Sequence, residues 1–314
     1  MATYILRRLI LAVIVIFIIT IFAFLIMQII PGDPVRAMLG VDASQKLVDS
    51  LRKELWLDRP LLVQYGHWIG NATKGDFGIS LQYQTDVGHL WAARLPITIN
   101  LSILAIIIST IFGITAGIIS AVIRGSFLDQ VISVLANAGV AIPVFWLGIL
   151  GIYLFGLYLD WLPIQGYTSP FEDFWLSVKK LVMPVICLSV PGLAMMTRQT
   201  RSSMLEVTRQ DYIRTAWSKG LAQRVIIFRH ALKNALNPIV TLIGVMLPIM
   251  VGGSVLVETV FNIPGMGRLL VGAVLSKDFI VVQAGIFLIA VVVSLVNLII
   301  DISYGWLDPR IRYE

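Results

Sequence analysis

Six long apolar segments, separated by polar ones, dominate the pattern along this chain. A helix rises 1.5 Å per residue, so about 20 apolar residues cross the roughly 30 Å hydrocarbon layer of a membrane. The segments that meet or approach this length are Leu9–Ile30, Ile97–Ile123, Val131–Leu159, Leu181–Met196, Ile239–Val260 and Phe279–Ile302. The pattern predicts an all-α, polytopic membrane protein with six spans, organised as a single transmembrane domain over residues 1–314.

The first apolar segment superficially resembles a signal peptide, because Arg7 and Arg8 precede it. Its 22 residues, however, exceed the about 7 to 15 of a signal-peptide core. The residues PGDP also follow it where a small-residue cleavage site would be expected. We therefore interpret Leu9–Ile30 as a retained first span.

The fourth apolar segment is short and carries two prolines, Pro184 and Pro191. Without it, the loop Asp160–Lys180 and the basic residues from Arg198 onward would lie on the same side of the membrane. The charges of these two regions favour opposite sides, so we retain the segment as a span.

Composition and charge agree with this topology. Hydrophobic residues make up 58% of the 314 residues and charged residues 13%, whereas about a quarter of a typical soluble domain is charged. The net charge is +6, and eight Lys and Arg residues lie between Arg198 and Lys233. Because basic residues mark the cytoplasmic side of membrane proteins, we expect both termini inside (N-in, C-in). The positive charge then reflects orientation in the membrane and not binding of nucleic acid.

The segment 31–96, between the first two spans, is too polar to lie in the membrane. Its sequence SQKLVDSLRKELWLDRP places Leu47, Leu51, Leu55 and Trp56 on one stripe of a helix, opposite charged residues. An amphipathic helix buries its apolar stripe against other parts of the protein. We therefore expect residues 31–96 to form a small extracytoplasmic cap packed on the spans.

Motifs for catalysis and metal binding are missing from the sequence. It contains no G-x-x-x-x-G-K-[ST] phosphate loop, no H-E-x-x-H zinc motif and no Cys/His cluster with metal-ligand spacing. We expect no catalytic residue, no metal ligand and no cofactor on this chain, so any ATP energy must enter through another chain. Glu258 and Asp301 lie near span ends, where a hydrated carboxylate is the simplest interpretation. The scarcity of ionisable residues in the spans argues against a secondary transporter, the alternative of another class.

Small residues and prolines interrupt two of the spans. A G-x-x-x-G pattern that begins at Gly113 permits close helix packing in the second span. The fifth span carries Pro248, Gly252 and Gly253, and such interruptions are tolerated where the backbone faces protein or a water-filled path. We name Pro248, Gly252, Gly253 and, further along this span, Glu258 as candidates for a translocation pathway or its gate.

The segment Asp211–Pro238, DYIRTAWSKGLAQRVIIFRHALKNALNP, is basic and mostly polar. Each Lys or Arg at the centre of a membrane costs about 2.5 to 3.5 kcal/mol, so the segment must be cytoplasmic. Its pattern predicts two short helices, Asp211–Lys219 and Val225–Asn237, and Gly220 between them suits the positive φ of a helix end. The apolar face predicted for the second helix contains Val225, Phe228, Ala231, Leu232, Ala235 and Leu236. Docking on a partner protein and lying on the membrane surface both remain open for this segment.

The residues Arg214-Thr215-Ala216, followed after three residues by Gly220, resemble the EAA loop of ABC-importer permeases. The match is partial, because Arg-Thr-Ala replaces Glu-Ala-Ala and the usual later Ile and Pro are replaced by His230, with Pro238 further on. Other motifs lie in the same order as in the B-type permease subunit of the peptide/nickel ABC importers, which the chain resembles over nearly its whole length. They are PGDP (31–34), GDFGIS (75–80), RLPITINLS (94–102), GGSVLVETVFNIPGMGRLL (252–270) and LDPRIR (307–312).

This resemblance implies a type I ABC-importer permease in the cytoplasmic (inner) membrane of a bacterium or archaeon. Such a subunit forms a heterodimer with a homologous second permease and works with two cytoplasmic ATPases, which bind ATP and Mg, and an extracytoplasmic solute-binding protein. A cytoplasmic coupling loop, residues 199–238, would dock on an ATPase. The residues to which the resemblance and the pattern assign coupling are Asp211, Tyr212, Arg214, Thr215, Ala216, Lys219, Gly220, Arg229 and His230.

The substrate class remains open between several solutes that relatives handle. Di- and oligopeptides are favoured, because the spans are poor in metal ligands. Nickel, metal chelates and glutathione-like solutes are the alternatives within the same machinery.

Overall fold

The computed structural model describes residues 2–29, 34–40, 42–80 and 82–307. In these ranges the chain is helical, and its one β-type pairing is an isolated antiparallel bridge between Ile79 and Asp86. Five helices are long and apolar enough to cross a membrane, and a bent pair of helices supplies a sixth span if its halves count as one. This confirms the predicted all-α, multi-span fold. Most residues of the PGDP and LDPRIR motifs lie outside the described ranges.

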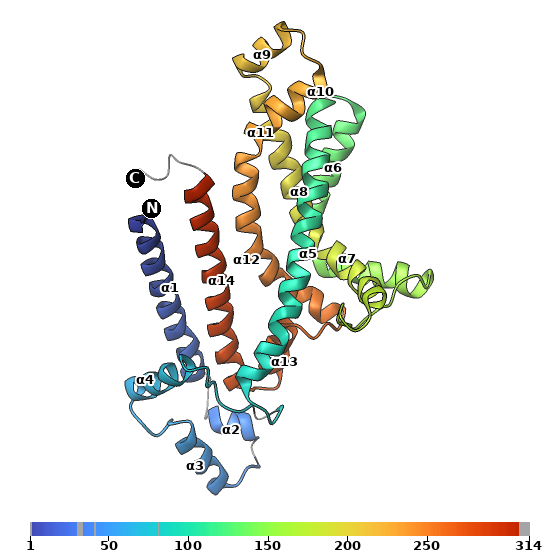
Figure 1. The fold of residues 1–314 in the computed structure, drawn as a ribbon. Coiled ribbons are helices and arrows are strands. Elements are labelled where there is room, and N and C mark those ends of the chain that lie inside the picture. The colour runs from blue at the N-terminus through green and yellow to red at the C-terminus, as the bar shows by residue number, and fades with distance from the viewer. Residues whose placement is uncertain (1, 30–33, 41, 81, 308–314) are drawn as a thin grey trace. The chain divides into compact units, whose positions relative to one another are not determined.

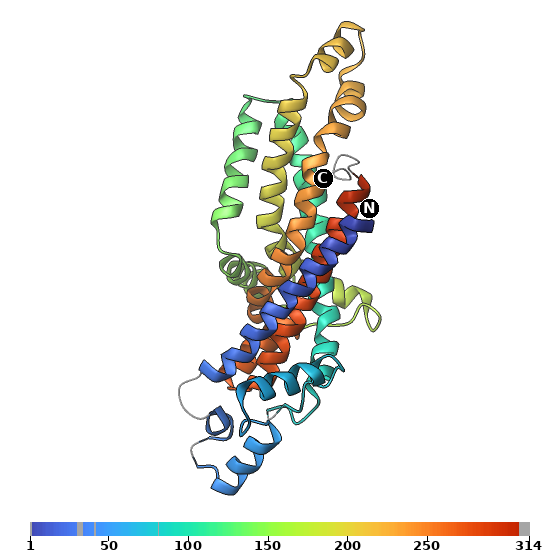
Figure 2. The same ribbon diagram turned by 90° about the vertical axis from the view of Figure 1, so that its left-hand side faces the viewer.

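The chain divides into two compact units, one formed by Met1–Ile97 with Gly265–Glu314 and the other by Thr98–Pro264. The helices of the first unit, together with the start of α5, are α1 (Ala2–Ile29), α2 (Pro34–Leu39), α3 (Gln45–Glu54), α4 (Leu61–Ala72), α13 (Met266–Leu275) and α14 (Phe279–Leu307). Helices α1 and α14 run side by side in opposite directions (Figures 1 and 2). Arg8 and Asp301 join them by an ion pair of 2.9 Å. The start of α1 and the end of α14 therefore lie at one end of the unit, in agreement with an N-in, C-in topology.

The cap helices α2, α3 and α4 lie at the opposite end of α1 and α14 (Figure 1). Helix α3 starts at Ser44, whose side chain accepts a hydrogen bond from Leu47 N–H. The predicted apolar stripe is partly wrong: Val48 and Leu51 are buried, whereas Leu47 is 50% exposed. Trp56 is also exposed, because α3 ends at Glu54 and Trp56 falls in the following turn.

The second unit contains most of α5 and all of the remaining helices. They are α5 (Val87–Val122), α6 (Phe127–Ala141), α7 (Val144–Gly151), the π-helix η1 (Ile152–Tyr158), α8 (Phe174–Val207), α9 (Asp211–Ser218), α10 (Gln223–Val225), the π-helix η2 (Ile226–Ala231), α11 (Leu232–Ala235) and α12 (Asn237–Val260). Helix α8 packs against α6, α7 and α12 and forms the centre of this unit. The segment predicted as a weak span, Leu181–Met196, is thus the middle of a 34-residue helix that also contains Pro184 and Pro191.

Glycines set the distance between α8 and its neighbours. A Cβ added to Gly113 of α5 would lie 2.4 Å from Met196 Cβ, and one added to Gly117 would lie 2.5 Å from Thr200 Cβ. The predicted close packing at the G-x-x-x-G pattern is therefore confirmed. On another side of α8, a Cβ on Gly192 would meet the terminal methyl groups of Met246 and Met250.

The third predicted span, Val131–Leu159, is not one straight helix. Helices α6 and α7 meet at an angle of 102°. Pro143 lacks a backbone N–H, and it forces the preceding residue, Ile142, into an extended conformation with φ −79° and ψ 126°. The predicted span is therefore a bent pair of helices, because an apolar run does not reveal a bend within it.

Candidate functional site

The elbow, Asp211–Pro238, forms a protrusion at one end of the second unit (Figure 1). Its first arm, α9, buries Ile213 and Ala216, and the side chains of Asp211, Tyr212, Arg214, Thr215 and Lys219 are exposed. Apolar residues three apart thus hold the helix against the protein while the intervening polar residues face outward.

Gly220 ends the first arm with φ +74°. Its N–H donates to Trp217 C=O at 2.9 Å, and Leu221 N–H donates to Ala216 C=O at 3.4 Å. These two bonds form a Schellman ending, which satisfies carbonyls that the helix leaves unpaired. No atom lies within 4 Å of a Cβ added at Gly220, so backbone conformation and not crowding favours glycine here. The predicted helix end at Gly220 is confirmed.

The second arm departs from the predicted regular helix, because η2 is a turn of π-helix. A π-helix has more residues per turn than an α-helix, so the residues within it and on its two sides do not share the face of one α-helical wheel. Ile226 is buried, whereas Phe228 is 60% exposed and Val225 is exposed as well. Ala231 and Ala235, also predicted on the apolar face, are buried as expected.

A small hydrophobic cluster supports both arms of the elbow. Its buried members are Met204, Ile213, Ala216, Ile226, Ala231 and Ala235. Ile118 and Ala121, near the end of α5, pack against the same cluster. Residues from α5, α8, α9, η2 and α11 therefore meet in one core, so that a displacement of α9 must also act on the ends of α5 and α8.

The outer face of the elbow combines exposed aromatic and basic side chains. Tyr212 is 43% exposed, and its hydroxyl accepts a hydrogen bond of 2.7 Å from Asn234 Nδ2, which links α9 to α11. Arg214 lies 3.6 Å from Asp211, and both side chains are largely in solvent. On η2, Arg229 is exposed and His230 is half-buried. The structure thus gathers most of the predicted coupling residues on two adjacent elements and leaves their charges accessible.

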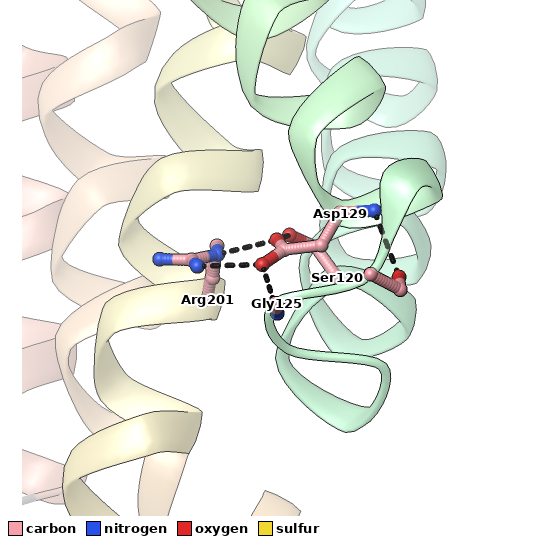
Figure 3. Close-up of polar contacts among 5 residues, drawn as sticks. Ser120, Gly125, Asp129 and Arg201 are labelled. Atoms are coloured by element: carbon pink, nitrogen blue, oxygen red, sulfur yellow. Dashed lines mark hydrogen bonds and ion pairs between the residues drawn. The ribbon is translucent and has the colours of Figure 1, made fainter.

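Sequence reasoning missed a buried charged cluster near the elbow, in which Asp129 of α6 meets Arg201 of α8 (Figure 3). Arg201 Nε and Nη2 donate to the two carboxylate oxygens of Asp129 at 2.8 and 2.9 Å. Ser120 Oγ donates to Oδ1, and Gly125 N–H donates to Oδ2 at 2.9 Å. The side chain of Asp129 is only 5% exposed, so these bonds compensate a carboxylate removed from water.

This cluster ties the turn between α5 and α6 to α8, ten residues before the elbow begins. One local signal was present: Ser126 and Asp129 have the spacing of a helix N-terminus, and Asp129 N–H donates to Ser126 Oγ at 3.2 Å. No local pattern pairs Asp129 with Arg201, because 72 residues separate them.

The four predicted pathway residues lie on α12, where Pro248, Gly252 and Gly253 fall on or beside one face and Glu258 lies on the buried side. Gly252 is exposed, with no atom within 4 Å of an added Cβ, whereas a Cβ on Gly253 would lie 3.6 Å from Leu188. Pro248 is half-buried within the continuous helix. Glu258 is fully buried, so interpreting it as a hydrated interfacial carboxylate was wrong.

Glu258 instead connects two helices of the second unit. Thr98 Oγ1 of α5 donates to Glu258 Oε1 at 2.6 Å, and Ser254 Oγ lies 3.0 Å from the same oxygen. Buried polar groups in membrane helices need such partners. Of the residues described, no group of three or more His, Cys, Asp or Glu side chains could hold a metal ion.

Comparisons with known proteins agree with this architecture. Residues 113–313 match the family described as binding-protein-dependent transport system inner membrane component, and residues 1–102 match the N-terminal part of such membrane components. The chain is 42% identical over 313 residues to a probable peptide ABC transporter permease protein of Sinorhizobium fredii, with 100% of both chains covered. It is 38% identical over 333 residues to the dipeptide transport system permease protein of Alkalihalophilus pseudofirmus, again with 100% of both chains covered.

Two solved structures share the fold over 70% of this chain. One is the MetNI methionine ABC transporter in inward-facing conformations, with a TM-score of 0.55, 17% identity and 96% of that chain covered. The other is an amino acid ABC transporter crystallised with histidines, with a TM-score of 0.51, 16% identity and 94% of that chain covered. The multi-span fold, the full-length relatives and the matched family agree, and the chain therefore belongs to the inner membrane components of binding-protein-dependent ABC transport systems.

Proposed function

We propose that this chain is the permease subunit of an ATP-driven importer of di- and oligopeptides in the cytoplasmic membrane of a bacterium or archaeon. Support for the substrate class comes from full-length relatives described as peptide and dipeptide permeases. The chain pairs with a homologous, non-identical permease and receives peptide from an extracytoplasmic binding protein. Two cytoplasmic ATPases bind ATP and Mg and hydrolyse the ATP, while this chain carries no catalytic residue and no cofactor.

The elbow is the part of this chain that docks on an ATPase. The observation that carries this assignment is the combination of a packed interior with an exposed outer face. Ile213 and Ala216 fix α9 to the hydrophobic cluster, and Arg214, Lys219 and Tyr212 remain accessible. When a partner displaces a helix held in this way, the displacement reaches α5 and α8, because packed cores deform little.

Helix α12 is our candidate for the pathway wall. Gly252 lies on an exposed face that also carries Val245, Ile249 and Leu256, and these residues recur at spacings of three and four. A face of this kind is available for contact with the second permease or with the translocated solute. Pro248 and Gly253 adjoin this face, whereas Glu258 acts from the buried side and holds α12 to α5.

Peptides fit this chain better than a free metal ion, since the described residues include no cluster of metal-ligating side chains. Metal chelates and glutathione-like solutes remain alternatives within the same machinery, because their recognition rests largely with the binding protein.

The test uses the complete transporter reconstituted in liposomes with its binding protein. Reversing the charge of both Arg214 and Lys219 to Glu is expected to abolish peptide-stimulated ATP hydrolysis and uptake of labelled dipeptide, while the complex still inserts. The matched control reverses Lys46 and Lys53, which are exposed on the cap helix α3. Unchanged coupled ATP hydrolysis in the Arg214/Lys219 variant would refute the docking assignment. Uptake of nickel but not dipeptide by the unmodified transporter would refute the substrate class.

A further inference from the structure

A cleft of about 450 Å³ lies in the first unit, lined by α3, α4, the loop 76–79 and the adjoining ends of α1 and α14. This volume falls in the range of roughly 300 to 1,000 Å³ typical of small-molecule sites. The cleft has a floor of carboxamides, walls of aromatic rings and a rim of carboxylates. The cleft belongs to the first unit, whereas the elbow and the candidate pathway helix belong to the second, so it needs an explanation of its own.

The floor is formed by Gln28, Gln64 and Gln283. Gln64 is 6% exposed and is held in place, because its Nε2 donates to Arg59 C=O at 2.7 Å and its Oε1 accepts from Gln28 Nε2 at 3.0 Å. These bonds occupy the donor and acceptor of Gln64 and fix the side chain of Gln28 toward the cleft.

Gln283 differs from the other two glutamines. It is 8% exposed and lines the cleft from α14, yet within the described residues its carboxamide makes no hydrogen bond. Its polar atoms are not among the fully buried, unpartnered side-chain atoms of the described residues, so the carboxamide is open to the cleft, where water or a ligand completes its hydrogen bonds. Gln283 therefore presents one donor group and one acceptor to whatever occupies the cleft.

The walls and rim define the charge of the occupant. Phe24, Trp68 and Phe77 supply aromatic surface, and Glu54 and Asp76 supply carboxylates. The lining contains no Lys or Arg. Asp76 Oδ1 accepts a hydrogen bond of 3.0 Å from Gly78 N–H, which fixes this carboxylate in its loop. A rim with two acids and no base attracts cations and repels anions.

We propose that this cleft binds the amino-terminal end of a short peptide, with its ammonium group at the Glu54 and Asp76 carboxylates and its first peptide amide at Gln283. The choice of a peptide over another amide-bearing amine rests on the proposed function. Aromatic walls accommodate the side chain of the first residue, and the peptide group matches the paired donor and acceptor of a carboxamide. A divalent metal does not fit, since no three ligating side chains meet among the described residues. The site would hold peptide at the extracytoplasmic cap.

The experiment is isothermal titration calorimetry of the full-length chain in lipid nanodiscs with alanyl-alanine as the probe. We expect saturable binding that N-acetylation of the dipeptide weakens about tenfold or more, because acetylation removes the ammonium charge. The double variant Glu54→Gln/Asp76→Asn and the single variant Gln283→Leu should each weaken binding of alanyl-alanine to a similar extent. The rim variant changes exposed residues, so a folding defect does not account for its effect.

Asp42→Asn is the matched control, because Asp42 is exposed in the same cap and does not line the cleft. It should bind the dipeptide as the unmodified chain does. Equal binding of the acetylated dipeptide, or unchanged binding by the rim variant, would overturn the proposed site, and so would absence of binding. If ATP-driven dipeptide uptake persists without binding here, this inference fails while the proposed function stands. If binding persists but the transporter does not import peptide, the proposed function fails instead.

Discussion

Two aspartate–arginine pairs lie in the second unit, and their surroundings differ sharply. Asp129 and Arg201 form two parallel hydrogen bonds, and the Asp129 side chain is 5% exposed. Asp211 and Arg214 approach only to 3.6 Å, and their side chains are 96% and 76% exposed. A charge pair in water contributes little to stability, whereas removing one member of a buried pair is strongly unfavourable.

The contrast separates two tasks that the same residue types perform. The buried pair holds α6 and the α5–α6 turn to α8, below the elbow, and the exposed pair leaves charges on α9 available to a partner. We therefore expect variants of the first pair to affect folding, and variants of the second pair to affect coupling to ATP hydrolysis.

The largest effect is expected for Asp129→Ala. It leaves the guanidinium of Arg201 without its carboxylate and also removes the acceptor of Ser120 and of the Gly125 N–H. We expect a loss of about 3 kcal/mol in the free energy of unfolding, at the lower end for a broken buried pair because Arg201 is partly exposed. Thermal unfolding of the purified chain in detergent measures this loss. A decrease no larger than that of Asp211→Ala would contradict the distinction between the pairs.

Arg201→Lys should have an intermediate effect. The ammonium keeps the charge but cannot form the two parallel bonds of a guanidinium. We expect about half the destabilisation of Asp129→Ala in the same unfolding experiment. A lysine variant as stable as the original chain would show that charge alone, without bidentate geometry, holds α6 to α8.

Two glycines with a positive φ extend the contrast, because Gly125 bonds to Asp129 of the buried pair and Gly220 ends the helix that carries the exposed pair. Gly125 has φ +81° beside the buried pair, and Gly220 has φ +74° at the end of α9. Neither has an atom within 4 Å of an added Cβ, so alanine should cost each site a similar roughly 1 to 2 kcal/mol. Although both variants should lose a similar amount of stability, only Gly220→Ala should lower peptide-stimulated ATP hydrolysis in the reconstituted transporter. Equal loss of coupling in both variants would refute this prediction.

The smallest change in stability is expected for Arg214→Ala. The exposed pair should contribute less than about 1 kcal/mol, so the unfolding temperature should hardly move. Dipeptide uptake per ATP hydrolysed should nevertheless fall, because the variant removes a charge from the docking face. A variant with normal uptake would exclude Arg214 from that face.

The sequence allowed prediction of those features that depend on length or on a single residue. Long apolar runs indicated the spans, since the thickness of a membrane fixes the length of helix required. Gly220 was predictable because one backbone conformation at one position decides a helix end. The close approach of α5 and α8 at Gly113 was predictable for a similar reason, as only a missing side chain permits it.

Features that depend on irregular geometry or on distant residues were not predictable in this way. Phe228 was placed on the buried face because a helical wheel assumes regular turns, and the π-helix η2 breaks that regularity. The bend at Pro143 had a signal in the proline itself, but continuous hydrophobicity outweighed it. Arg201 and Asp129 meet only after α6 and α8 have packed, and no pattern within either helix reports that contact.

The helix contacts at glycines of the second unit differ in how easily they deform. At Gly113 and Gly117 the two nearest atoms are a Cβ and a backbone oxygen, which cannot move without displacing a whole helix. At Gly192 the two nearest neighbours are the terminal methyl groups of Met246 and Met250, which adjust by rotation about side-chain bonds, and Ser109 Oγ of α5 follows at 2.8 Å. Helices α5 and α8 should therefore move together as one rigid body. Helix α12 should be able to shift along α8 where their boundary is lined by methionines.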